Sequence, residues 1–378
     1  MEVFSQTSDS CNFKKKKPEM KNKFKILFLI AFLSNYCFAQ NNEEIALQKG
    51  EVAIKLMDNG KIEESIMLLE ECQKLDPENF DYPYEIAYAN YLKKDYKKTI
   101  GILEKLENYK NINAQLYSLW GNSYDNLDNP KKAIEIYDNG IKKFPQNGLL
   151  YLEKGVVYEF EKEYNNAIET YKKGISAEPK YPSNYYRIAN LYLNSDDKVP
   201  GLIYGEIFLN LERTTNRTKE MSKNLFDAYK NSIVFENNEW KKLNLCKQMK
   251  INPTQFEKDK KLPLCMVFGK WFTFGLLNSR VKEYNLDSIS KIRKEFIKNY
   301  FEKDNKDYPN ILFEYQKKMI DNEIFEAYNH YIFQMGATEE FSEWLKTNNT
   351  EYEKFVEWYT KNENIINPTE ANYFQFIN

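Results

Sequence analysis

Small and aromatic residues recur along residues 46–211 with the spacing of packed helices. In the stretch from Tyr151 to Lys180, Gly155 and Ala167 are followed by tyrosines three and four positions later. This spacing places each small residue and its tyrosine on one face of a helix. Pro179 closes the stretch, because proline cannot continue a helix interior. The pattern predicts two antiparallel helices that approach closely at the small residues and are joined by a short turn.

The same pattern occurs again 34 residues earlier. Six identical positions make up the earlier copy, namely Gly121, Tyr124, Ala133, Tyr137, Gly140 and Pro145. Further steps of 34 residues reach Ala87 and Ala53 in one direction and Ala189 in the other. With "YSLWGNSY" from Tyr117 as its best copy, the period resembles the tetratricopeptide repeat. A single helix pair cannot bury its apolar faces alone, so neighbouring pairs are expected to stack.

The expected fold is all-α, an α-solenoid of about five tetratricopeptide helix hairpins followed by a C-terminal helical domain. Residues 40–215 form the solenoid, residues 216–233 a capping helix, and residues 234–378 the C-terminal domain. The capping helix is predicted because apolar residues recur at every fourth position from Met221, and a solenoid needs a polar outer face at its end. The most apolar stretch of the C-terminal domain, Leu262 to Leu277, is expected to be its central buried helix. Further helices are expected at about 286–301, 308–336 with a turn at 321–322, 341–345 and 352–359.

Residues 20–39 have the features of a signal peptide. Three lysines follow Met20, an apolar run extends from Ile26 to Leu33, and Cys37 and Ala39 form a small-x-small cleavage site. The protein is therefore expected to be exported, periplasmic or secreted, with a mature chain that begins near Gln40. A retained membrane anchor is the alternative, although the run is shorter than the ~20 residues of a spanning helix. Residues 1–19 are interpreted as a disordered upstream extension.

Charge and motifs exclude several classes of function. The chain has 54 basic and 56 acidic residues, so no global field favours nucleic acid, and none is expected as a partner. His330 is the only histidine, which excludes multi-histidine metal sites. Phosphate loops, Cys-x-x-Cys pairs and G-x-S-x-G elbows are also missing from the sequence, so no catalytic residue, cofactor or metal is expected. Cys246 and Cys265 are either one disulfide or two buried thiols.

The resemblance implies that the first helix of each pair lines a concave groove that binds a peptide. Carried over to this sequence, it gives as groove residues Tyr84, Tyr88, Tyr91, Ser118, Asn122, Asp125, Tyr186 and Asn190. Ser118 and Tyr186 stand where relatives that clamp a C-terminal carboxylate have lysine, which argues against that ligand. The expected function is an exported, non-enzymatic scaffold for a protein or peptide partner in the cell envelope. The alternative is an enzyme or small-ligand-binding protein whose site lies in the C-terminal domain and is lined by Trp271, Trp344 and Trp358.

Overall fold

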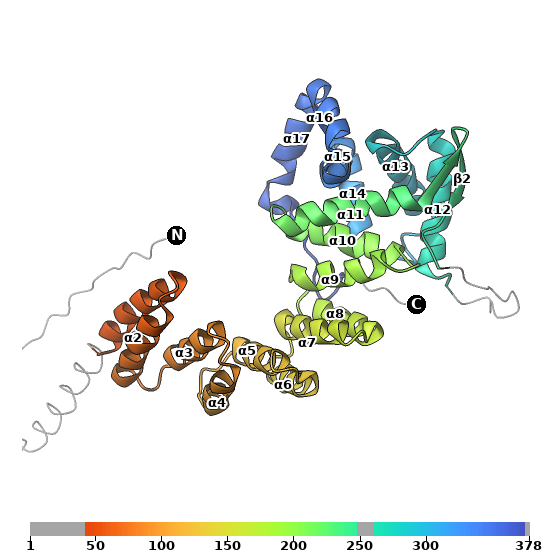
Figure 1. Cartoon of the computed structure of the whole chain (residues 1–378). Helices are drawn as coiled ribbons and strands as arrows, with labels where there is room; N and C mark the ends of the chain where they lie inside the picture. The colour runs from red at the N-terminus through yellow and green to blue at the C-terminus, as the bar shows by residue number, and fades with distance from the viewer. Residues whose placement is uncertain (1–41, 248–260, 375–378) are drawn as a thin grey trace, which may run out of the picture. The chain divides into compact units, whose positions relative to one another are not determined.

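The computed structural model describes residues 42–247 and 261–374. The predicted upstream extension and signal peptide lie outside the described residues. Helices account for nearly all regular structure in the described part of the chain, which confirms the all-α class (Figure 1). The chain divides between Asn111 and Ile112 into two compact units, and each is described by itself.

The first unit contains two helix pairs. Residues 42–58 form a helix that is followed by α2 (Ile62–Leu75), and α3 (Asp81–Leu92) is followed by α4 (Tyr96–Leu106). Short turns join the helices of each pair, with positive φ angles at Gly60 and Lys94. The core of the unit includes Ala53, Leu69 and Cys72, which lie at positions of the repeat pattern, together with Ala46 and Ile86.

The second unit begins with three further pairs, in agreement with the expected five hairpins. The pairs are α5 (Ala114–Asp125) with α6 (Pro130–Lys143), α7 (Gly148–Phe160) with α8 (Tyr164–Ala177), and α9 (Pro182–Leu193) with α10 (Val199–Leu211). Asparagine side chains accept hydrogen bonds from the first-turn N–H groups of α5, α6 and α7, and so begin these helices. The caps are Asn113, Asn129 and Asn147.

Close packing within a pair explains the repeated glycines. A Cβ atom on Gly121 would lie 2.3 Å from the ring of Tyr137, and one on Gly155 would lie 2.3 Å from the ring of Tyr171. Both rings are fully buried. Tyr124 and Tyr158, at the other tyrosine positions of the repeat pattern, are only partly buried. Each gap is filled from the second helix, because the glycine leaves room for a whole ring opposite it.

The second unit continues with α11 (Asn216–Ser232) and a short antiparallel hairpin of β1 (Ile233–Glu236) and β2 (Glu239–Leu243). No strand is expected here from the sequence. Asn237 and Asn238 form the turn with φ angles of 51° and 61°, which matches a two-residue hairpin turn. The "NN" dipeptide between apolar residues was the signal that could have revealed the hairpin.

The C-terminal helices agree with the expected ones. They are α12 (Leu264–Ser279), α13 (Leu286–Lys303), α14 (Ile311–Asp321), α15 (Phe325–Phe333), α16 (Thr338–Thr347) and α17 (Asn349–Tyr359), with short 3-10 turns η2 (Gln334–Gly336) and η3 (Asn362–Asn364). On α12, Phe268 and Phe272 are buried, whereas Phe274 and Leu277 are exposed. Among the described residues, none of the helices has the length and apolar character needed to cross a membrane.

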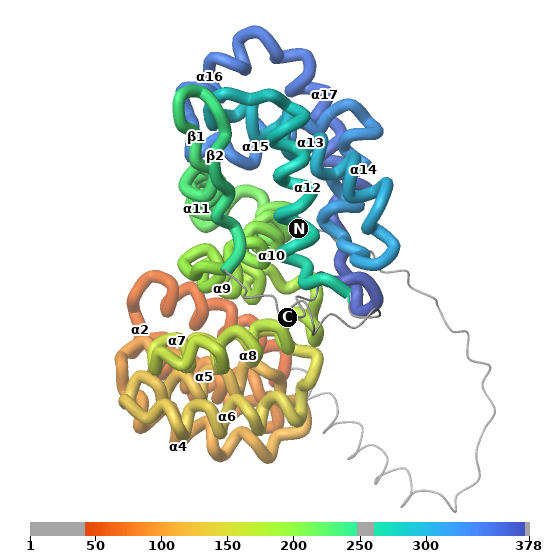
Figure 2. The backbone as a smooth tube through the Cα atoms, turned by 90° about the vertical axis from the view of Figure 1, so that its right-hand side faces the viewer, coloured from red at the N-terminus to blue at the C-terminus, as the bar shows by residue number. Residues whose placement is uncertain are grey.

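One hydrophobic core joins the last repeats to the C-terminal helices. It extends without a break from Ala167 on α8 to Phe374 near the end of the described chain. Every residue of α10 except Leu211 is buried, and α10 contacts α11, α12 and α14 (Figure 2). Tyr229 of α11 stacks on Phe272 of α12 with ring centroids 5.4 Å apart. The apolar face of α11 is therefore covered by the C-terminal helices.

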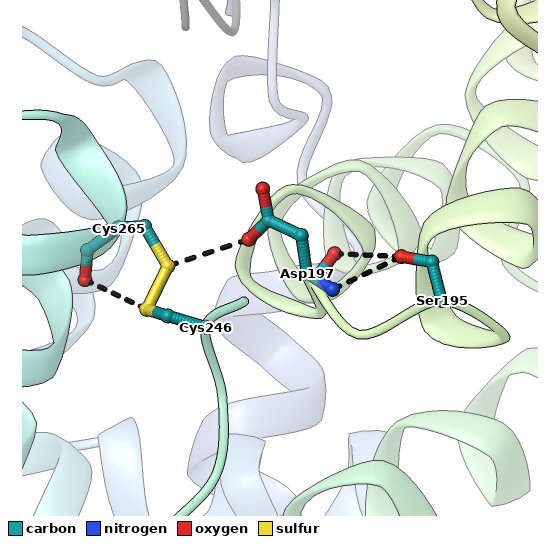
Figure 3. Close-up of a disulfide and its surroundings, with 4 residues drawn as sticks. All are labelled: Ser195, Asp197, Cys246 and Cys265. Atoms are coloured by element: carbon teal, nitrogen blue, oxygen red, sulfur yellow. Dashed lines mark hydrogen bonds between the residues drawn. A yellow bond between two sulfur atoms is a disulfide. The ribbon is translucent and has the colours of Figure 1, made fainter. Parts of the chain in front are cut away.

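A disulfide between Cys246 and Cys265 attaches the segment after β2 to the first turn of α12 (Figure 3). The structure thus selects the first of the two alternatives that the sequence left open. Asp197, in the turn between α9 and α10, places a carboxylate oxygen 3.3 Å from the sulfur of Cys265. In the same turn, the backbone N–H of Lys198 donates to the carbonyl of Leu245. The disulfide therefore lies where the last repeat meets the C-terminal helices.

Candidate binding surface on the first helices

The first helices of the second unit form one continuous row. Helix α5 contacts α7, α7 contacts α9, and α9 contacts α11, whereas α6, α8 and α10 make fewer contacts with one another. The first helices of successive pairs are therefore neighbours in space. We refer to the polar side chains that link these four helices as the first-helix face.

Ser118 and Asn122 of α5 meet a carboxylate of the next first helix. Both side chains act to lower the pKa of Glu153 on α7, and the hydroxyl of Tyr137 donates to Oδ1 of Asn122 at 2.6 Å. Burial raises the pKa of Glu153, and the charge of Asp125 acts in the same direction. Sequence reasoning did not identify Glu153. The signal that could have found it is the 34-residue step, which takes Glu153 to Arg187 at the same position of α9.

Arg187 of α9 contacts both helices of the preceding pair. Its guanidinium forms an ion pair with Glu159 of α7 at 3.0 Å, and the hydroxyl of Tyr171 donates to the same carboxylate at 2.5 Å. Arg187 also attracts the negative charge of Glu153, but its hydrogen bonds go to Glu159 and Tyr171. Arg187 is consequently positioned by two neighbouring elements rather than left to move in solvent.

Tyr186 and Asn190 of α9 meet residues that lie 34 positions later on α11. The hydroxyl of Tyr186 donates to Glu220 at 2.9 Å, and Nδ2 of Asn224 donates to Oδ1 of Asn190 at 3.3 Å. In both contacts the partners are 34 positions apart, which is the length of one repeat. Helix α11 therefore takes the position that the first helix of a sixth pair would have. The sequence predicts α11 only as a capping helix. The 34-residue step from Tyr186 to Glu220 could have shown that α11 also contributes side chains to the first-helix face.

Asp125 ends α5 at the acidic edge of the face. Burial raises the pKa of Asp125, and the carboxylates of Glu161 and Asp128 add to this effect. No ion pair to Asp125 occurs within the described residues. The edge of α5 therefore has an excess of negative charge.

Tyr84, Tyr88 and Tyr91 all lie on α3, in the first unit. Tyr84 stacks on Phe80 with centroids 5.4 Å apart, and burial raises its pKa. Tyr88 is 38% exposed, and Tyr91 packs edge-on against Tyr96 at 5.3 Å. The three tyrosines thus differ in environment, with Tyr88 the most accessible of them.

The remaining candidate chemistry is dispersed. Trp271 donates to Asp304, Trp344 stacks on His330, and Trp358 packs on Tyr315, so the three tryptophans have different neighbours. In the described part of the chain, Asp197, Cys246 and Cys265 are the one group whose atoms converge as metal ligands would. The two sulfurs are bonded to each other, so the thiolates that a metal would require are not formed.

The paired helices define a helical-repeat protein. Residues 149–181, which cover α7 and α8, match the family model of the tetratricopeptide repeat, so the chain contains such a repeat. No curated protein matches the sequence.

Several solved structures resemble about half of the chain. PilF of Pseudomonas aeruginosa is 16% identical with a TM-score of 0.42, covering 50% of this chain and 86% of its own. TTC0263 of Thermus thermophilus is 16% identical with a TM-score of 0.40, covering 48% and 98%. MamA of Desulfovibrio magneticus RS-1 is 16% identical with a TM-score of 0.36, covering 45% and 97%. Similarity at this level carries no argument about partners.

Proposed function

We propose that this protein is an exported, non-enzymatic scaffold that binds a protein or peptide partner on the first-helix face. The observation that carries the proposal is the continuity of that face across α5, α7, α9 and α11. Its side chains are positioned by contacts between successive repeats, such as Tyr186 with Glu220. A surface that is ordered in this way loses little conformational entropy when a partner binds.

Export is supported by two independent features. The lysines and the apolar run of residues 20–39 have the order of a secretion signal. The Cys246–Cys265 disulfide fits an oxidising compartment, since cytosolic thiols are normally kept reduced. We therefore place the scaffold in the periplasm or outside the cell. Intact mass of the secreted protein checks this point, and a retained Met1 or Met20 would contradict it.

Site-specific photocrosslinking in the native host tests the binding surface. A photoreactive phenylalanine analogue is placed at Tyr186 on the first-helix face or, as the control, at Tyr164 on α8, which is 51% exposed. We expect a discrete crosslinked product from position 186 only, and loss of that product when Asn122 and Asn190 are both changed to Ala. Equal products from both positions, or no product from position 186, would contradict the proposal.

A further inference from the structure

A separate cleft lies among the C-terminal helices. Residues 283–287 at the start of α13, His330 of α15, and Glu340 and Trp344 of α16 line this cleft of about 470 Å³, which we name the His330 cleft. Its lining includes the carboxylates of Glu283, Asp287 and Glu340 but no lysine or arginine. The cleft is therefore acidic.

His330 lines the cleft and is held through Nδ1. The side chain is 1% exposed, and its ring stacks on Trp344 with centroids 4.1 Å apart. Nδ1 lies 3.0 Å from the carbonyl oxygen of Glu326, which can only accept, so Nδ1 carries the proton and Nε2 a lone pair in the neutral ring. Burial lowers the pKa of His330, although Asp287, Glu326 and Glu340 act in the opposite direction.

The lone pair of His330 faces another acceptor. Nε2 lies 3.5 Å from Oδ1 of Asp287, so in the neutral ring two acceptor atoms face each other. Lys291 does not supply a donor between these two atoms. Its ammonium is 3.9 Å from the other oxygen of Asp287, and both side chains are more than half exposed, so the pair is weak. A group with several N–H donors and a positive charge would satisfy both atoms.

Glu340 and Glu283 add negative charge to the cleft. Glu340 accepts the backbone N–H of Leu286 at 2.8 Å, and Glu283 accepts from Asn285 at 3.2 Å. In each case the second carboxylate oxygen has no further hydrogen bond within the described residues. The ligand atoms of His330, Asp287 and Glu340 do not converge as those of a metal site would. The arrangement thus favours an extended donor group over a metal ion.

We propose that the His330 cleft binds a primary ammonium group, which donates hydrogen bonds to Nε2 of His330 and to Oδ1 of Asp287. Glu283 and Glu340 provide further negative charge around it. The ammonium belongs either to a free alkylamine or to a lysine side chain of another protein. This site is independent of the partner that binds the first-helix face.

The single histidine makes a direct test possible. In protein labelled with ¹⁵N-histidine and purified without a histidine tag, the one imidazole of the sequence gives one pair of nitrogen signals. Cadaverine and Nα-acetyl-lysine methylamide are the two probes, and Nα-acetyl-norleucine methylamide is the uncharged control. We expect a saturable shift of the Nε2 signal with a Kd of about 1 mM for at least one charged probe. A shift with acetyl-lysine methylamide alone assigns the site to a lysine side chain, and a shift with cadaverine alone assigns it to a free amine.

Matched variants separate the site from general electrostatic attraction. Asp287→Asn removes one acceptor charge at an exposed side chain, and we expect it to weaken binding roughly tenfold or more. Glu339→Gln changes an exposed carboxylate next to Glu340 in the first turn of α16. Glu339 does not line the cleft, so we expect no effect on binding. Thermal unfolding confirms that both variants remain folded. The proposal is overturned if neither charged probe shifts the Nε2 signal, or if both variants weaken binding equally.

Discussion

Glu206 of α10 and Arg293 of α13 form an ion pair whose side chains are only 3% and 4% exposed, although they lie 87 positions apart in the chain. Both carboxylate oxygens of Glu206 accept from Nη2 of Arg293, at 2.6 and 2.5 Å. Gln316 of α14 and Tyr328 of α15 also donate to Glu206. This buried network fixes the last repeat to three C-terminal helices.

Loss of the Glu206–Arg293 ion pair should lower the free energy of unfolding. Arg293→Met leaves the charge of Glu206 buried without its partner, so we expect a loss of about 3–5 kcal/mol in the free energy of unfolding. Urea unfolding followed by circular dichroism measures the change. Asp321→Asn is the control, since its pair with Lys317 is exposed, and it should change stability by less than ~1 kcal/mol. Equal effects of the two variants would show that the Glu206–Arg293 pair is not buried in solution.

Gly155→Ala should destabilise the protein despite the higher helix propensity of alanine. The new methyl group would lie 2.3 Å from the ring of Tyr171, so the ring or the helix must move, at a cost of about 1–3 kcal/mol. Gly101→Ala on α4 is the matched control, because nothing lies within 4 Å of its Cβ position. It should be stabilising by up to ~1 kcal/mol. Thermal melts that show the same sign for both variants contradict the predicted helix contact.

The tyrosines of α3 should separate into packed and accessible residues. We expect Tyr84→Ser to lower stability by about 2–3 kcal/mol, since it removes a ring stacked on Phe80. Tyr88→Ser, at a position that is 38% exposed, should change stability by less than ~1 kcal/mol. Because all three tyrosines are predicted groove residues, we expect their joint replacement by Ser to abolish partner capture. Melting temperatures measure the change in stability, and crosslinking yields measure partner capture. A large loss of stability from Tyr88→Ser alone would place that ring in the core.

Reduction of the disulfide should weaken the attachment of α12. Cys246 and Cys265 are 19 positions apart, and a loop of this length corresponds to about 3 kcal/mol of stabilisation. We therefore expect dithiothreitol to lower the unfolding midpoint of the wild-type protein. The double variant Cys246→Ser, Cys265→Ser should start from the lower midpoint and not respond to dithiothreitol, although buried Cys72 is still present. A response in the double variant would trace the effect to another thiol.

Stability should fall as the pH decreases below 6.5. Burial lowers the pKa of His330 in the folded state, so between that value and 6.5 the unfolded chain binds the additional proton. The contribution of His330 is complete above pH 6.5 and is lost as the pH falls towards the folded-state pKa. Urea unfolding across this range, compared with His330→Gln, isolates the effect because the sequence has no other histidine. Parallel curves for the two proteins would contradict it.

The sequence by itself determined the repeat, because local geometry dictates it. Gly121 and Gly155 mark where a ring must enter, and Pro145 and Pro179 mark where helices end. Both requirements are met within one period of 34 residues. The row of first helices follows from the same period, and five of the eight predicted groove residues lie on α5 and α9 of that row.

Only the tertiary structure decided which charges meet. Glu159 and Arg187, Glu206 and Arg293, and His330 and Asp287 look like ordinary helical residues in the sequence, since no short-range pattern distinguishes a buried charge from a solvated one. The role of α11 was decided in the same way, because its periodicity predicts an apolar face but not what covers it. Burial and partner choice depend on elements that are 34 to more than 80 positions apart, and these contacts exist only once the last repeats and the C-terminal helices share one core.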